Sequence, residues 1–453
     1  MFKSINPATG HVIETYSPLS ANAANLLVGN AGSAAKAWAQ VDVDTRAAML
    51  ERLALLLESR LEDYAQLITR EVGKPLVEAR SELGKCALLC RYYAAHAPGF
   101  LAEEQVNAAA KQSYLSYQPL GVVLGIMPWN FPFWQVFRFA VPVLTAGNGC
   151  LLKHAPNVTG SALAIEALFL DAGYPQYVLS ALPIEIDQVE AIIQQDVVQG
   201  VALTGSAEAG AAVAAVAGRA IKKSVLELGG SDPYLILSDA DLDLAAGKCA
   251  QSRLNNCGQT CISAKRFIVQ QEVLEPFTAK LIAEMEKRRI GDPADEVHTL
   301  GPMAREDLRA NLHRQVLGSV AAGATLRLGG ALPPGQGWFY PPTVLTDVRP
   351  GMPAFDEEVF GPVAAVVAVA SEAEALRLAN QSAYGLGAAV FTRDVERGKR
   401  LAAQLECGTC CINDLVKSDL RLPFGGIKRS GYGRELSKQG IREFVNVKSI
   451  CVG

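Results

Sequence analysis

Cys261 is placed where a reactive thiol would be expected. It follows the small, polar segment Gly-Gln-Thr at 258–260, which favours a loop or turn over a helical core. The commoner fate of a single cysteine is burial as an inert side chain. The local sequence makes Cys261 a candidate nucleophile and leaves the inert alternative open.

Two other polar residues in apolar surroundings could assist such a thiol. Asn130 lies between Pro128 and Pro132 after an apolar strand, and its NH2 group could stabilise an oxyanion. The alternative is a rigid turn in which Asn130 caps the next helix. Glu227 ends another apolar strand, where desolvation would raise its pKa into the range of a general base. The alternative is a carboxylate satisfied by a helix N-terminus.

A turn that could bind phosphate occurs at Gly205 and Ser206. It connects a predicted strand to a predicted helix, and N–H groups at a helix start suit a pyrophosphate. One such turn is a weak signal, and the usual GxGxxG dinucleotide pattern is absent here.

Composition narrows the class of protein. The chain has 453 residues, half of them hydrophobic, and a net charge of −4, which gives no global field for nucleic acid or a membrane. We find no secretory signal, no apolar run free of polar residues and no paired CxxC set for zinc. We therefore expect a cytoplasmic enzyme with reduced thiols, no metal, no nucleic acid partner and no membrane partner.

The elements that must position these residues are predicted from hydrophobic periodicity. Residues 20–100 read as helical, and residues 122–239 alternate short apolar strands with helices, which indicates a doubly wound parallel sheet. A second α/β block follows, with strands at 266–271, 362–370, 387–392 and 409–414 and helices at 274–288, 306–321, 372–381 and 395–406. Alternating polar segments at 113–118 and 445–453 predict exposed edge strands.

Six motifs together resemble one family. They are PWNFP at 128–132, LTGS at 203–206, LELGGSDP at 226–233, GQTC at 258–261, EEVFGPV at 357–363 and PFGGIKRSGYGRE at 423–435. Their order and spacing resemble those of the NAD(P)-dependent aldehyde dehydrogenases over nearly the whole chain. The fold implied is an α/β, aldehyde dehydrogenase-like one. It has a doubly wound cofactor-binding domain (1–102 and 120–229), an α/β catalytic domain (230–436) and a small β oligomerisation arm (103–119 and 437–453).

The resemblance implies a role for each matching position. Cys261 would form the thiohemiacetal, Asn130 and the Cys261 N–H the oxyanion hole, and Glu227 would activate water. The implied cofactor-binding residues for NAD or NADP are Trp129, Lys153, Gly205, Ser206, Glu358 and Phe360. Glu435 resembles a further carboxylate in the family's proton path.

Substrate choice follows from Arg138 and Ser418. Both resemble the carboxylate-binding residues of succinate-semialdehyde dehydrogenases, which favours succinate semialdehyde or a similar short carboxy-aldehyde. The alternative for Arg138 is an internal Asp or Glu partner. Better-known members of that group have a second Arg where this chain has Asn255, and Arg421 or Lys417 is a candidate replacement.

Several points stay open at this level. Pro156 stands where NAD-preferring relatives have a glutamate, so we expect both NAD and NADP to work. The arm implies a homodimer or a homotetramer without choosing between them. Cys257 is either a small turn residue, which is favoured, or a redox partner of Cys261. The rival functions are an aldehyde dehydrogenase for an aromatic or amino aldehyde, an acylating CoA-dependent relative and a non-catalytic relative.

Overall fold

The computed structural model describes residues 1–453, and its first sheet is a mainly parallel one of six strands. The spatial order is β19-β9-β8-β5-β6-β7, in which only β19 is antiparallel to its neighbour. The strands are β5 (Val122–Met127), β6 (Gly149–His154), β7 (Leu179–Ala181), β8 (Val198–Thr204), β9 (Lys223–Glu227) and β19 (Gly431–Tyr432). The order of the parallel strands reverses between β5 and β8, and open α/β sheets bind ligands at the carboxyl ends of strands at such a point.

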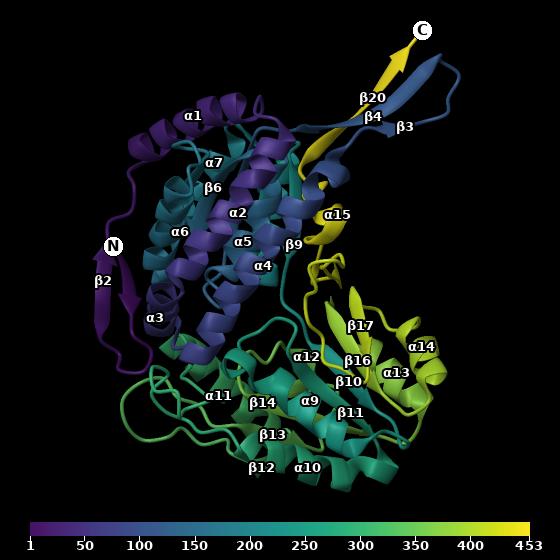
Figure 1. The fold of residues 1–453 in the computed structure, drawn as a ribbon. Helices are drawn as coiled ribbons and strands as arrows, with labels where there is room; N and C mark the ends of the chain where they lie inside the picture. Colours follow the sequence, from purple (N-terminus) through teal and green to yellow (C-terminus); the bar gives the residue numbers. More distant parts are fainter.

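Helices cover both faces of this sheet (Figure 1). Val123 packs into a core shared with α2, α4, α5 and α6, whereas Leu124 packs into a core shared with α1, α7 and α8. The helices are α1 (Ala21–Trp38), α2 (Val43–Ser59), α3 (Leu61–Val72), α4 (Leu76–Leu101), α5 (Trp134–Thr145), α6 (Thr159–Asp171), α7 (Val189–Gln194) and α8 (Ala207–Arg219). The predicted doubly wound sheet is therefore confirmed, and the helical stretch expected at 20–100 is four separate helices.

The second sheet has seven strands in the order β12-β13-β14-β11-β10-β16-β17, with β12 antiparallel. The strands are β10 (Asp232–Ile236), β11 (Ala264–Gln270), β12 (Thr325–Leu328), β13 (Thr343–Thr346), β14 (Val363–Val369), β16 (Gly387–Phe391) and β17 (Thr409–Ile412). The helices around it are α9 (Leu242–Leu254), α10 (Leu274–Glu286), α11 (Glu306–Ala321), α12 (Pro353–Asp356), α13 (Glu372–Asn380) and α14 (Val395–Ala402). The central strands are apolar and buried on both faces, as expected for parallel sheets.

Three strands form an arm that projects from the body and carries the C-terminus at its tip (Figure 1). The strand β20 (Val445–Val452) pairs antiparallel with β4 (Gln112–Pro119), which also pairs with β3 (Glu104–Gln105). The predicted pair of polar strands is thus present, and the two segments that the resemblance grouped in one arm pair with each other.

Several short elements were not anticipated from the sequence. They are the hairpin β1 (Phe2–Ile5) and β2 (Val12–Tyr16), the pair β15 (Tyr384–Gly385) and β18 (Ile427–Lys428), α15 (Ser437–Ile441) and the 3-10 turns η1 (Pro156–Val158), η2 (Ile186–Gln188), η3 (Asn255–Gly258) and η4 (Gln271–Val273). The strand β19 lies inside the range predicted for the catalytic domain, yet it pairs with β9 of the first sheet. The domain boundaries stay a prediction.

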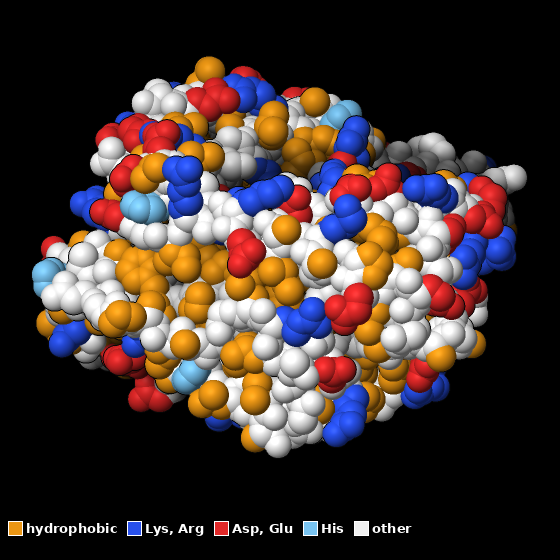
Figure 2. All heavy atoms as spheres, turned by 90° about the horizontal axis from the view of Figure 1, so that it is seen from below, with side chains coloured by type: hydrophobic (Ala, Val, Ile, Leu, Met, Phe, Trp, Pro, Cys, Tyr) orange, Lys and Arg blue, Asp and Glu red, His pale blue; other side chains and the backbone are white.

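The length and apolarity of the helices bear on whether the chain could cross a membrane, and the surface charges bear on whether one sign dominates a face. None of the helices combines the length and apolarity that a bilayer crossing would require. On the face seen from below, basic and acidic side chains are interspersed with apolar ones (Figure 2). This mixture agrees with the small net charge of the chain.

Because β5 and α5 pack closely, adding a methyl group at Gly125 of β5 should destabilise the protein. A Cβ at Gly125 would overlap the ring of Phe139, which is only 2% exposed and cannot move aside. We expect Gly125→Ala to destabilise the protein by about 1–3 kcal/mol, because overpacking a core forces strain into its surroundings. The measurement is the thermal unfolding midpoint.

Gly84→Ala on α4 is the matched control. A Cβ there meets nothing within 4 Å, so this change should leave the midpoint equal or slightly higher. A Gly125→Ala midpoint at or above that of the wild type would contradict the packing argument.

Candidate active site

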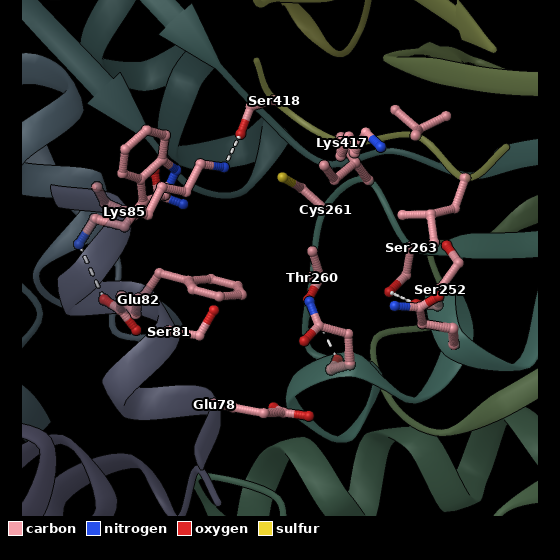
Figure 3. Close-up of a pocket in the computed structure, with 18 of the residues that line it drawn as sticks. Glu78, Ser81, Glu82, Lys85, Ser252, Thr260, Cys261, Ser263, Lys417 and Ser418 are labelled. Atoms are coloured by element: carbon pink, nitrogen blue, oxygen red, sulfur yellow. Dashed lines mark hydrogen bonds between the residues drawn. The ribbon is translucent and has the colours of Figure 1, made fainter. Parts of the chain in front are cut away.

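A cavity of about 450 Å³ opens beside Cys261 (Figure 3). Its walls come from α4, α5, α9, the turn around η3 and the loop after β17. The lining side chains that carry charge or a nucleophile are Glu78, Glu82, Lys85, Arg138, Cys261, Arg288 and Lys417. The cavity therefore brings residues far apart in sequence to one thiol.

The segment before the nucleophile has an unusual backbone. Asn256, Cys257 and Gly258 all adopt positive φ, at 51°, 54° and 71°. Such a run is costly for residues with a Cβ and persists only where the surroundings hold it. One such contact is the hydrogen bond of 2.8 Å from the Asn256 backbone N–H to the half-buried carboxylate of Glu78 on α4. The strained turn ends at Gly258, three residues before Cys261, the residue that must be placed accurately.

The thiol of Cys261 points into the cavity (Figure 3). Burial raises its pKa to about 11, although the positive charges of Arg138 and Lys265 act in the opposite direction. The ammonium of Lys265 also donates to the backbone oxygen of Cys261 at 2.6 Å. The Cys261 side chain is partly exposed, whereas an inert structural cysteine would be fully buried.

Asn130 is tied to the nucleophile segment. Its Nδ2 donates to the backbone oxygen of Gln259 at 2.9 Å, and its own backbone oxygen accepts from Asn256 Nδ2 at 2.8 Å. Asn130 does not cap α5, because Glu82 accepts the N–H groups of Phe133 and Trp134 there instead. One Nδ2 hydrogen of Asn130 remains without a partner.

Glu227 ends β9 and is only 3% exposed. No hydrogen-bond donor lies within reach of its Oε1. The alternative stated from the sequence, in which the N–H groups of a helix N-terminus satisfy the carboxylate, is therefore wrong for that oxygen. Burial raises its pKa well above the usual value, the carboxylate of Glu435 raises it further, and Arg138 opposes both. Such a group accepts a proton far more readily than an exposed glutamate.

Arg138 lines the cavity but also has an internal partner. Its side chain is 2% exposed, forms an ion pair with Glu435 and lies over the Phe424 ring, 4.8 Å from the centroid. Its Nη2 is 3.5 Å from Thr204 Oγ1. The alternative stated from the sequence, an internal acidic partner, is therefore present beside the substrate-binding interpretation.

Lys85 on α4 was missed by the sequence analysis. Its Nζ donates to Ser418 Oγ at 2.5 Å and lies over the Trp134 ring, 4.2 Å from the centroid. A usable signal was its spacing, since Glu78, Glu82 and Lys85 fall on one face of a helix that is otherwise largely apolar.

The two candidates for a second substrate cation differ in position. Lys417 lines the cavity but forms an ion pair with Asp414. Arg421 is exposed, pairs with Asp419 and does not line the cavity. Asn255 also lines the cavity and brings no charge.

Cys257 does not reach the cavity. Its side chain is 2% exposed, and burial raises its pKa. It is not among the lining residues, which favours the small turn residue over the redox partner.

The residues predicted to hold a dinucleotide lie at the carboxyl ends of the first sheet. Lys153 ends β6 next to β5, is 6% exposed and has no ion-pair partner, and its pKa is lowered by burial. Ser206 caps α8 through the N–H of Ala209, and a Cβ at Gly205 would meet only Leu203. An unpaired cation beside a helix start fits an anionic phosphate-bearing group.

The other three predicted cofactor residues are Glu358, Trp129 and Phe360. Glu358 accepts from the Gly230 N–H at 3.0 Å and is 3.5 Å from Lys265 Nζ. The rings of Trp129 and Phe360 meet edge to face with centroids 5.9 Å apart. Lys265, which also donates to the backbone oxygen of Cys261, thus connects Glu358 to the nucleophile segment.

Comparison with known proteins gives one consistent result. The family model described as "Aldehyde dehydrogenase family" matches residues 1–450. The chain is 47% identical to "Succinate semialdehyde dehydrogenase [NAD(P)+] Sad" of Escherichia coli K12 over 99% of this chain and 97% of that protein. It is 46% identical to a "Probable succinate-semialdehyde dehydrogenase [NADP(+)]" of Synechocystis over 99% of both chains.

A solved structure agrees. The succinic semialdehyde dehydrogenase of Streptococcus pyogenes, crystallised with NADP+, superposes with a TM-score of 0.98 at 38% identity over the full length of both chains.

The raised pKa of Cys261 predicts how its alkylation depends on pH. For a thiol that ionises near pH 11, the thiolate fraction and the rate of iodoacetamide labelling should rise about tenfold per pH unit between pH 8 and 10. Mass spectrometry of the labelled peptide measures the rate at Cys261. Buried Cys257 in the same peptide region is the internal control and should label far more slowly. A labelling rate that levels off below pH 9 would contradict the raised pKa.

Proposed function

The chain belongs to the aldehyde dehydrogenase family, and we propose that it oxidises succinate semialdehyde, or a similar short carboxy-aldehyde, to the acid with NAD or NADP. The observation that carries the proposal is one cavity holding the Cys261 thiol together with Arg138, Lys85 and Ser418. A carboxylate on one end of a short chain would bind the cationic wall while its aldehyde carbon meets the thiol.

Covalent chemistry begins at Cys261. Its thiol loses its proton to solvent, and the sulfur adds to the aldehyde carbon, whose C=O π electrons move onto the oxygen to give a thiohemiacetal oxyanion. Two donors are free to hold that oxygen, because the Cys261 N–H donates no hydrogen bond within the chain and one Asn130 Nδ2 hydrogen is unused. Donors fixed in place before the reaction stabilise the developing charge without reorganisation.

NAD or NADP, when bound, would supply the hydride acceptor, and the Cys261 adduct would become a thioester by losing its hydride. We assign its binding to Lys153, Gly205 and Ser206 for the adenosine and phosphates and to Glu358, Phe360 and Trp129 for the nicotinamide side. The unpaired charge of Lys153 and the open space at Gly205 support this assignment.

Glu227 completes the turnover as the base. It takes a proton from a water molecule that attacks the thioester carbon, and the Cys261 sulfur leaves as the acid is released. Its raised pKa suits the task, because a carboxylate that binds its proton more tightly is a stronger base toward water. A base for hydrolysis also favours this function over transfer of the acyl group to CoA.

Glu435 and Arg138 lie on the path between Glu227 and the cavity. Burial raises the pKa of Glu435, and the ion pair with Arg138 opposes that shift. We assign Glu435 to proton transfer with Glu227, and Arg138 with Ser418 to the substrate carboxylate.

We propose assembly as a homodimer or homotetramer through the arm. The free edge of β20 and its exposed Val447 offer backbone groups and apolar surface to a second subunit. A cytoplasmic location stays a prediction from the sequence.

A panel of aldehydes tests the proposed substrate. We expect kcat/KM for succinate semialdehyde to exceed that for butanal and benzaldehyde by at least about tenfold, the size of a charge-assisted contact. Formation of NAD(P)H at 340 nm measures the rate.

Cys261→Ala should abolish the signal, whereas Cys257→Ala is the matched control and should keep it. Equal kcat/KM for benzaldehyde would contradict the substrate, and turnover by Cys261→Ala would contradict the mechanism.

The absence of a carboxylate at Pro156 predicts dual cofactor use. We expect kcat/KM with NAD and with NADP to differ by less than about a hundredfold, since no negative side chain repels a 2′-phosphate there. Pro156→Glu should lower kcat/KM for NADP relative to NAD by about tenfold or more through like-charge repulsion. A wild type with a stronger preference than a hundredfold would refute this prediction.

A further inference from the structure

We propose that Lys85 is the second cation for the substrate carboxylate and, with Ser418, makes the enzyme specific for carboxy-aldehydes. This inference rests on the proposed function and assigns a residue of its specificity. Asn255 brings no charge at the position where related enzymes have a second Arg. Lys85 on α4 would supply that positive charge instead.

The position of Lys85 supports a contact with substrate. Its Nζ lies at the cavity wall and donates to Ser418 Oγ at 2.5 Å, on the side toward which the Cys261 thiol points (Figure 3). Its Nζ also lies over the Trp134 ring, 4.2 Å from the centroid, so the ring and Ser418 together hold the ammonium in one place. An ordered cation and an adjacent hydroxyl form a ready pair of donors for a carboxylate.

Charge balance distinguishes Lys85 from the other cations of the cavity. No carboxylate lies within ion-pair distance of Lys85, whereas Arg138 has Glu435 and Lys417 has Asp414. Burial raises the pKa of Glu78, and the positive charge of Arg288 is among the effects that oppose this shift, so Arg288 acts on a carboxyl of its own. A partly buried ammonium with no counter-ion is unfavourable unless a ligand supplies the charge.

The groups around Lys85 set its charge. Burial and the nearby charge of Arg138 lower its pKa to about 8, while Cys86, Asp419 and Glu82 raise it. An arriving carboxylate would favour the protonated ammonium, so binding and protonation are linked. Above pH 8 the free enzyme loses this charge and with it part of its preference for an anionic aldehyde.

The test compares succinate semialdehyde with its uncharged methyl ester. Lys85→Met keeps an unbranched side chain and removes the charge. Its kcat/KM for succinate semialdehyde should fall about tenfold or more relative to that for the ester, mainly through KM. Lys85→Arg should recover most of the preference. Arg91→Met is the control, because it removes a cation from the same helix at a site paired with Glu51 and Glu58 outside the cavity.

The outcomes separate this inference from the proposed function. If wild-type enzyme does not prefer succinate semialdehyde over the ester, the proposed function fails and the inference fails with it. If the wild type shows the preference and Lys85→Met keeps it, only the inference is overturned. An equal loss for both substrates would make Lys85 a structural residue and would also overturn it.

A pH profile provides a readout that a packing role would not move. The ratio of kcat/KM for the two substrates cancels the ionisation of Cys261 and Glu227, which acts on both. In the wild type the ratio should fall as pH rises through about 8, and in Lys85→Met it should be flat. A fall of the same size in Lys85→Met would assign the titration to another group and overturn the proposal.

Discussion

Two carboxylates on α4, the half-buried Glu78 and the buried Glu82, hold together the segments that build the active site. Glu78 accepts the N–H of Asn256 in the strained turn before Cys261, and Glu82 accepts the first two N–H groups of α5. Glu82 is also paired with buried Lys74. Removing one partner of such a pair leaves an uncompensated charge, which is why buried pairs of this kind are costly to disturb. One helix face thus fixes the nucleophile turn and the start of the helix that carries Arg138.

The same low-polarity environment sets the chemistry. Burial raises the pKa of both the Cys261 thiol and the Glu227 carboxyl, so both groups hold their protons more tightly than in water. Arg138 opposes both shifts and is itself paired with Glu435. These four groups therefore form one electrostatic unit, and a change at any of them alters the proton affinity of the others. The proposed nucleophile and base work within that balance.

The sequence was sufficient for much of the fold, and it supplied the site residues that stay predictions. The apolar strands at β5, β6 and β8 and the helices between them follow from periodicity, because a parallel sheet buries both faces. The prediction that Asn130, Glu227 and Cys261 act together rested on six motifs in register. Short elements such as β19 and the N-terminal hairpin were missed, because two to five residues carry too little periodicity to be recognised.

The sequence by itself determined which residue types are available: one cysteine after Gly-Gln-Thr, one glutamate at an apolar strand end, and an arginine in the most apolar window. Only the tertiary structure decided their partners. Arg138 and Glu435 are about 300 residues apart in sequence, as are Lys85 and Ser418, yet each pair is in contact. Charge pairing in a buried cavity depends on distances through space, and no local pattern contains them. The fold thereby gave Arg138 an internal partner and left Lys85 without a carboxylate.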